Sequence, residues 1–334
     1  MFTSPLGRGT RYAFRRETQR QPNIMSIPPI EIAPELRPQM GKIPHVPVAN
    51  AFSRRVVRFL TKLSARTWHY DGVTLEKRQT EGGVGLRLFT PVNNRSGAAL
   101  LWIHGGGMVI GTAAQDDRLC AETARALGIV VVSTEYRLAP EHPFPAAIED
   151  CLAAWSWLVE SASALQVNPA RLAIGGESAG GGLAAALVQR VHDAGGPQPV
   201  AQWLFCPMLD DRTAARRELD VLNHPIWNNA QNRIGWRCYL GVEPGADLVP
   251  EYAVPARREN LSGLPPAWIG AGDIELFYAE AKTYADRLTA AGVECVLDIV
   301  PGAPHGFEKL AADTTLTQNY LARARAWLQT QVVP

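Results

Sequence analysis

The chain has 334 residues, in which 33 lysines and arginines balance 32 aspartates and glutamates. This length fits a single α/β domain that carries insertions, and it is sufficient to bury a large core. The near-zero net charge excludes a strong global field for nucleic acid or an anionic membrane, so the expected partner is a small neutral molecule. No apolar run approaches the roughly 18 residues that a membrane span requires.

The N-terminal segment differs from the rest of the chain in composition. Residues 1–24 hold five arginines and one acidic residue, which is typical of a tail. An Arg-rich, acid-poor start is also compatible with a mitochondrial address. Because Met25 stands directly before a proline-rich run, we interpret residues 1–24 as a disordered extension ahead of the natural start.

From about residue 72 the sequence alternates between short β-rich runs and longer helical ones. Strands that are buried on both faces, with helices between them, predict a mostly parallel sheet in an α/β fold. We expect a hairpin over 72–91, followed by strands over 98–104, 129–137, 171–176, 200–207, 266–272 and 295–300. Between and after these strands we expect helices over 114–128, 145–160, 178–196 and 275–291, and a last helix from about 315.

Residues 207–262 interrupt this alternation, because they contain helical patches and no convincing buried strand. We interpret them as a cap insertion that returns to the core, and residues 25–60 as the N-terminal part of the same cap. The remaining residues, 61–206 and 263–334, form the core. Four side chains from the two cap segments are candidates for the substrate pocket or for the interior of the cap: Trp227, Trp236, Phe52 and Leu209.

The cysteines are odd in number, widely spaced and free of any CxxC pattern. This argues against both a disulfide framework and a zinc site, and it predicts reduced thiols in a cytoplasmic protein with no bound metal. The five cysteines are Cys120, Cys151, Cys206, Cys238 and Cys295.

A glycine cluster surrounds one serine at residues 175–182. It lacks the Gly-Lys-Ser/Thr ending of a phosphate loop, so two interpretations remain: a strand-to-helix turn with an incidental serine, or the G-x-S-x-G turn that exposes a nucleophilic hydroxyl above a sheet. On the second interpretation Ser178 is the nucleophile. Its neighbour Glu177 either orients nearby structure or is a buried capping carboxylate.

A serine hydroxyl needs a base, and the base needs an orienting carboxylate. Among seven histidines, His305 is the candidate, because its Gly/Pro-rich loop joins the last strand to the last helix, where open α/β sheets place ligands. Asp273 directly follows the preceding strand and is the predicted acid. Glu275 lies two residues further on and is its rival.

Acyl transfer also needs donors for a developing oxyanion. The run His104-Gly105-Gly106-Gly107 follows the buried strand over 98–104, and its glycines expose backbone N–H groups. We expect the N–H groups of Gly106, Gly107 and Ala179 to stabilise the oxyanion, with His104 and Gly105 as supporting residues.

The sequence resembles the hormone-sensitive-lipase-like branch of the α/β-hydrolases, the bacterial family IV carboxylesterases, from about residue 25 onward. That resemblance implies an eight-stranded sheet, a helical cap, no cofactor, and hydrolysis of esters with short to medium acyl chains. The motifs that carry it are HGGG at 104–107, YRLAPEHPFPAAIEDC at 136–151, GESAGG at 176–181, YAVPAR at 252–257, LPPAWIGAGD at 264–273 and PGAPHGF at 301–307.

The chain departs from the family pattern at two places. Glu177 stands where many members have Asp, which keeps the charge. After Asp273, many members continue with Pro-Leu, whereas this chain has Ile274 and Glu275, so Glu275 remains an alternative acid.

The motifs together predict a serine carboxylesterase that works through an acyl-enzyme. An amidase or deacetylase with the same triad, and a hydrolase-fold protein that binds a ligand without turnover, are the alternatives. The expected partner is a small-molecule ester, without nucleic acid or a membrane span. Family precedent and edge strands favour a homodimer, and the physiological ester stays open.

Overall fold

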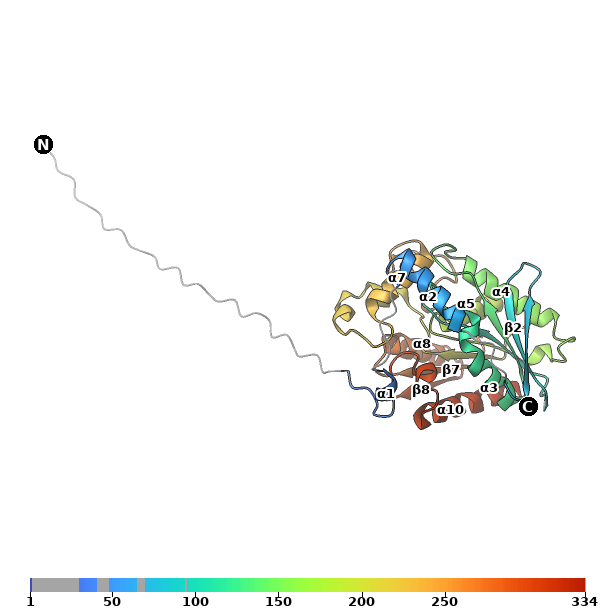
Figure 1. Cartoon of the computed structure of the whole chain (residues 1–334). Helices are drawn as coiled ribbons and strands as arrows, with labels where there is room; N and C mark the ends of the chain where they lie inside the picture. The colour runs from blue at the N-terminus through green and yellow to red at the C-terminus, as the bar shows by residue number, and fades with distance from the viewer. Residues whose placement is uncertain (2–29, 41–47, 65–69, 94, 334) are drawn as a thin grey trace.

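The computed structural model describes residues 1, 30–40, 48–64, 70–93 and 95–333 (Figure 1). Most of the predicted disordered extension, residues 2–24, lies outside the described residues. The predicted N-terminal cap segment contributes two described helices, α1 (Arg37–Met40) and α2 (Ala51–Ser64).

Eight strands form one sheet in the order β1-β2-β4-β3-β5-β6-β7-β8. The first pairings, β1 with β2 and β2 with β4, are antiparallel, and every later pairing is parallel. The predicted α/β-hydrolase architecture, with its eight-stranded and mostly parallel sheet, is confirmed. The strands are β1 (Val73–Gln79), β2 (Gly85–Pro91), β3 (Ala99–Ile103), β4 (Val130–Glu135), β5 (Leu172–Glu177), β6 (Ala201–Phe205), β7 (Ala267–Gly272) and β8 (Cys295–Val300).

The central strands are apolar throughout because both faces of the sheet are covered. Successive residues of β3 alternate between two separate cores: Leu101 and Ile103 pack into one, whereas Leu100 and Trp102 pack into the other. Helices α4 (Ala146–Glu160), α5 (Ala179–Ala194) and α8 (Tyr278–Ala290) cover the first face. Helices α3 (Asp117–Leu127) and α10 (Thr315–Val332) cover the second.

The helices lie close to the predicted ranges. Helix α3 ends where Gly128 adopts a left-handed conformation (φ 65°), as a C-terminal glycine commonly does. The remaining helices are α6 (Asp211–Ala215), α7 (Asn229–Leu240) and α9 (Phe307–Leu310). Short 3₁₀ turns lie at η1 (Ala113–Asp116), η2 (Pro169–Arg171), η3 (Arg217–Val221) and η4 (Pro255–Arg257).

The segment 207–262 forms no strand; it contains α6, η3, α7 and η4. Helix α7 is defined at both ends, because Asn228 and Gln231 cap each other's backbone N–H at its start and Gly241 ends it with φ 73°. In Figure 1, α7 and α2 both lie at the upper end of the molecule, away from α10.

The loops that leave the carboxyl ends of the parallel strands meet at one edge of the sheet. They follow β3, β5, β7 and β8, and they carry the HGGG run, Ser178, the turn at 273–277 and His305, respectively. Within the part of the chain that the structure describes, no helix is both long and apolar enough to cross a bilayer.

Candidate active site

Ser178 stands at the tight turn between β5 and α5. Its backbone angles, φ 55° and ψ −121°, lie in a region that non-glycine residues rarely occupy. The turn is held on both sides, since Ser178 N–H donates to the Phe205 carbonyl (2.8 Å) and the Ser178 carbonyl accepts from Met208 N–H (2.9 Å). This backbone keeps the hydroxyl of Ser178 at the start of α5.

The surrounding glycines are needed for close packing, because they have no side chain, and not for unusual backbone angles. None of the five glycines in 175–182 has a positive φ, whereas Ser178 does. A Cβ on Gly176 would lie 2.5 Å from the backbone carbon of Gly180, and a Cβ on Gly181 would lie 2.9 Å from Pro207 Cβ. The cluster therefore lets β5, α5 and the neighbouring loops approach more closely than any side chain would permit.

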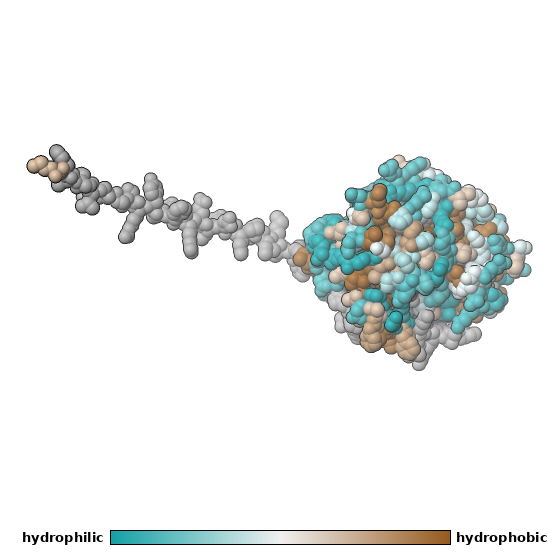
Figure 2. Space-filling view, turned by 90° about the horizontal axis from the view of Figure 1, so that it is seen from above, coloured by the Kyte–Doolittle hydropathy of each residue, from teal (hydrophilic) through white to brown (hydrophobic). Residues whose placement is uncertain are grey.

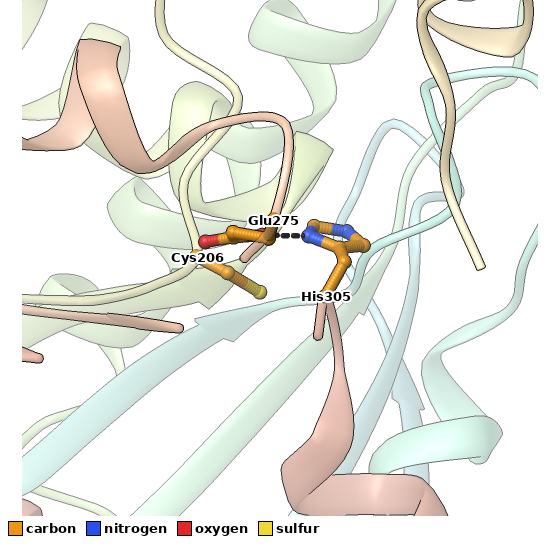
Figure 3. Close-up of side chains that lie close together, drawn as sticks. All are labelled: Cys206, Glu275 and His305. Carbon is orange, nitrogen blue, oxygen red and sulfur yellow. Dashed lines mark hydrogen bonds and ion pairs between the residues drawn. The ribbon is translucent and has the colours of Figure 1, made fainter. Parts of the chain in front are cut away.

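Ser178 and His305, the predicted nucleophile and base, lie in hydrogen-bonding contact. The Ser178 hydroxyl donates to His305 Nε2 over 2.8 Å. On the other side of the ring, His305 Nδ1 donates to Glu275 Oε2 (Figure 3). All three side chains are buried, and the Phe277 ring packs edge-on against the imidazole at 5.1 Å. The geometry is that of a nucleophile, a base and an orienting acid.

The carboxylate that contacts His305 is Glu275, so the predicted placement of Asp273 beside the histidine is corrected. Asp273 is exposed, and its Oδ1 accepts the backbone N–H of Gly302 (2.7 Å). The reason is the turn at 273–277: its first residue faces outward and braces the loop that follows β8. Two residues later the same turn directs Glu275 inward to His305.

The HGGG run places two N–H groups beside the serine. Gly106 and Gly107 have φ of 123° and 58°, which side-chain-bearing residues rarely adopt. Their N–H groups donate to no other group among the described residues, and Ala179 is the first residue of α5, whose N–H has no helical partner. These three groups are therefore free to receive an oxyanion. A Cβ on Gly105 would lie 3.2 Å from Ser178 Cβ, so this loop packs directly on the nucleophile turn.

His104 braces this loop, as predicted for a supporting residue. Its Nδ1–H donates to the Gly105 carbonyl (2.8 Å), its ring stacks on Tyr136 with centroids 4.2 Å apart, and its own carbonyl accepts from the Tyr136 hydroxyl (2.9 Å). Burial lowers the pKa of His104, because the charged form is poorly solvated there. A neutral, fully packed ring suits a structural role.

Glu177 belongs to a buried charge cluster that the motifs did not reveal. Lys309 Nζ lies 2.5 Å from Glu177 Oε2 and 2.6 Å from Asp116 Oδ1. Asp116 also accepts from Trp102 Nε1 (2.8 Å). Burial is the main cause that raises the pKa of Glu177 to about 8. The Glu177–Lys309 ion pair joins the turn that carries Ser178 to α9, which follows His305. Glu177 therefore connects the segment of the serine to the segment of the histidine.

A second missed contact anchors the acid turn. His224 Nδ1 donates to the Ile274 carbonyl over 3.0 Å, which links the segment between η3 and α7 to the turn that carries Glu275. Of the three supporting residues that the motifs did not reveal, only Lys309 could have been found from the sequence, because it stands four residues after His305. Asp116 and His224 come from distant segments.

A cavity of about 150 Å³ opens above Ser178 and His305. The residues that line it include the apolar side chains Ile110, Ile226, Trp227 and Leu310 and the glycines 105–107. A larger depression of about 730 Å³, lined by charged residues of α6 and α8, shares no residue with it. The chemistry identifies the smaller cavity as the candidate site, because it alone contains the serine and the histidine.

Of the four predicted pocket residues, the structure places only Trp227 in this cavity. Trp236 and Leu209 are fully buried in the core and do not line it. Phe52 lies on the outer side of α2 and is 78% exposed. Together with Val56, Phe59 and Leu60 it forms part of the apolar surface on this helix, and Figure 2 shows apolar patches within a mainly hydrophilic surface when the molecule is viewed from above.

Comparisons with known proteins agree with this fold. Residues 100–309 match a family model described as the alpha/beta hydrolase fold. The chain is 35% identical over 247 residues to the carboxylic ester hydrolase LipN of Mycobacterium tuberculosis, which covers 72% of this chain and 65% of LipN. The chain thus spans about two thirds of the length of that relative.

Solved structures show the same likeness over nearly the whole chain. A bacterial heroin esterase superposes with a TM-score of 0.83 at 35% identity, covering 90% of this chain and 98% of that one. An esterase from the bacterial hormone-sensitive lipase family superposes with a TM-score of 0.75 at 30% identity, covering 90% and 99%. The chain therefore belongs to the α/β-hydrolase family, in its hormone-sensitive-lipase-like branch.

Proposed function

We propose that this protein is a serine carboxylesterase that hydrolyses short- to medium-chain esters through an acyl-enzyme. The observation that carries the proposal is the 2.8 Å contact between the Ser178 hydroxyl and His305 Nε2, with Glu275 on the other ring nitrogen. The relatives named as ester hydrolases support the same reaction class.

In the acylation step, Ser178 Oγ attacks the ester carbonyl carbon while its proton passes to His305 Nε2. Glu275 keeps the ring in the tautomer that accepts this proton, and it stabilises the imidazolium that forms. The negative charge on the carbonyl oxygen is received by the N–H groups of Gly106, Gly107 and Ala179. Collapse of this intermediate breaks the ester C–O bond, and His305 returns the proton to the leaving alcohol.

Deacylation repeats the sequence with water. His305 Nε2 takes a proton from the water as its oxygen attacks the acyl carbon, and Ser178 leaves with that proton. The released product is a carboxylic acid. No cofactor is needed for either half of the cycle.

We further propose that α2 and the segment 207–262 form a cap over this chemistry. Trp227 and Ile226 from that segment line the cavity, and Gly235 of α7 packs against the Gly107 carbonyl, which a Cβ would approach to 2.8 Å. From α2, Arg58 donates to the Val109 carbonyl at 2.8 Å. These contacts tie the cap to the loop that holds the oxyanion donors.

Trp227 should limit the length of the acyl chain. A cavity of about 150 Å³ has room for few methylenes, and each buried methylene contributes about 0.8 kcal/mol, or about fourfold in kcat/KM. Activity should rise from acetyl towards butanoyl or hexanoyl esters and then fall. Trp227→Ala should move the optimum to longer chains, and two additional accommodated methylenes should raise kcat/KM for the longer ester about 15-fold.

Trp236→Phe is the matched control for this variant, because Trp236 is buried outside the cavity. It should leave the chain-length optimum unchanged. A series of p-nitrophenyl esters from acetyl to decanoyl measures both profiles. An unaltered optimum in Trp227→Ala would show that this wall does not contact the acyl chain.

Covalent labelling tests the proposed function directly. A p-nitrophenyl phosphonate should inactivate the protein with one adduct per chain, and peptide mass spectrometry should place it on Ser178. Parallel assays with p-nitrophenyl esters and matching anilides compare esterase with amidase activity. Absence of ester turnover, or an adduct on another residue, would refute the proposal.

The cellular setting is part of the same proposal. The five cysteines are free thiols, which supports work in the reducing cytoplasm on a small-molecule ester. We also predict that the protein forms a homodimer, and analytical ultracentrifugation of the purified protein would measure its oligomeric state.

A further inference from the structure

Cys206 lies directly behind the catalytic histidine, in a position that the reaction does not use. It follows β6, has a φ of 35° and is buried. Its Sγ, a carboxylate oxygen of Glu275 and a ring nitrogen of His305 all lie within 4.8 Å of one another. Figure 3 shows these three side chains converging from three separate segments. Sulfur, nitrogen and carboxylate oxygen are the three donor types that bind zinc in proteins.

One of these donors lacks a partner. Glu275 Oε2 accepts from His305, but Glu275 Oε1 is buried and has no hydrogen-bond partner among the described residues. A buried carboxylate oxygen without a partner is costly, because it has lost its water without replacement. That atom is therefore available to a cation.

Two further carboxyl groups lie close to Cys206. Cys206 belongs to a second group of potential ligands with Glu177 and Glu308, and its Sγ lies 3.8 Å from Glu308 Oε1. Lys309 is already shared between Glu177 and Asp116. Within the described parts of the chain, Glu308 has no ion-pair partner, so its carboxylate is available as a further ligand.

We propose that Cys206, Glu275 and His305 form an inhibitory site for a zinc ion, with Glu308 as a neighbouring fourth donor. Zinc takes four tetrahedral ligands, and the ligand types here match that preference better than those of magnesium or calcium, which bind oxygen alone. The widely spaced cysteines gave no such signal, because the ligands meet only in the fold.

Zinc at this position would stop the reaction without touching Ser178. The metal would bind His305 Nδ1 and replace the hydrogen bond to Glu275. The ring proton would then reside on Nε2, and the thiol of Cys206 would release its proton to solvent. An imidazole that carries a proton on Nε2 cannot accept the proton of the Ser178 hydroxyl, so acylation fails.

The first test measures ester hydrolysis and therefore rests on the proposed function. Purified full-length protein is incubated with Zn²⁺, and p-nitrophenyl butanoate hydrolysis is followed over time. Activity should fall slowly, because the ligands are buried, and it should return after EDTA. Cys206→Ala should keep the basal activity and lose at least tenfold in sensitivity to Zn²⁺. Mg²⁺ should have no effect on either protein.

Cys238→Ala is the matched control, because it removes a more accessible thiol that belongs to neither group of potential metal ligands among the described residues. It should remain as sensitive to Zn²⁺ as the unaltered protein. Equal inhibition of the unaltered protein and Cys206→Ala, or inhibition abolished by Cys238→Ala, would overturn the proposal.

A second test does not depend on activity. Co²⁺ is added to the Ser178→Ala variant, and the absorption spectrum is recorded. Coordination by a thiolate should give one equivalent of a near-ultraviolet sulfur-to-cobalt band, which Zn²⁺ displaces and which the double variant Ser178→Ala/Cys206→Ala lacks. No band, or a band that persists without Cys206, would overturn the proposal even if esterase activity is confirmed. A protein that shows the band but no ester turnover would instead refute the proposed function alone.

Discussion

Glu275→Gln should lower kcat for p-nitrophenyl butanoate by about 1,000- to 10,000-fold, whereas Asp273→Asn should stay within about tenfold of the unaltered protein. The amide of Gln cannot act as an anionic acceptor for His305 Nδ1–H. The ring then loses the orientation and tautomer that leave Nε2 free for the Ser178 proton. Asp273 only accepts the N–H of Gly302 at the surface, so its substitution changes a loop contact and not the base.

Single-turnover kinetics distinguish this loss from misfolding. Glu275→Gln should retain the melting temperature of the unaltered protein within a few degrees, since Gln fills nearly the same volume. It should show no burst of p-nitrophenol, because acylation itself is slowed. Glu275→Asp, which keeps the charge on a shorter side chain, should recover part of the rate. A large loss of kcat in Asp273→Asn, together with a nearly unchanged kcat in Glu275→Gln, would reverse the assignment.

Most of the fold was predictable because its signals are local. Each parallel strand is a short apolar run between turn residues, and each intervening helix carries its own start or stop. The contact between Ser178 and His305 was predictable for a related reason: G-x-S-x-G and the loop before the last helix place the two residues at the same edge of a parallel sheet.

The carboxylate that contacts His305 was not predictable from its position in the sequence alone. Asp273 and Glu275 both follow β7 within one turn, and the choice depends on which side of that turn faces the imidazole. The backbone of residues 273–277 decides it, and His224 helps to hold that backbone through the Ile274 carbonyl. Neither feature can be recognised from the order of the residues. The sequence did indicate that this turn is unusual, because Ile274 and Glu275 stand where many family members have Pro-Leu.

The choice between pocket wall and cap interior depends on neighbours from distant segments. Trp236 and Phe52 both belong to helices with apolar residues, yet one packs inward and the other faces outward. Likewise, Cys206 acquires its His305 and Glu275 neighbours only when β6, β7 and β8 align. Composition identifies such residues as apolar or reactive, but the packing of the cap and the sheet decides what they contact.

The glycine-rich turn is the part of the site where packing leaves least freedom. A Cβ on Gly180 would lie 2.5 Å from the His104 carbonyl oxygen and closer still to that of Ile103. Both obstacles are backbone atoms, and they belong to the end of β3 and the start of the oxyanion loop. No rotamer change relieves such an overlap, so either α5 or this loop must move.

Gly180→Ala should therefore damage both stability and catalysis. Forcing extra volume into a packed interior costs typically about 1–3 kcal/mol, and more where backbone must shift. For a chain of this length we therefore expect the melting temperature to fall by about 2–5 °C. The soluble fraction should also lose at least about 100-fold in kcat, because the displaced loop carries the oxyanion donors. Gly82→Ala is the matched control, since a Cβ there would meet only Thr80 Oγ1 at 3.9 Å. Thermal unfolding and butanoyl ester kinetics of both variants provide the test. A Gly180→Ala protein as stable and active as Gly82→Ala would mean that β3 and α5 do not pack as closely as the structure places them.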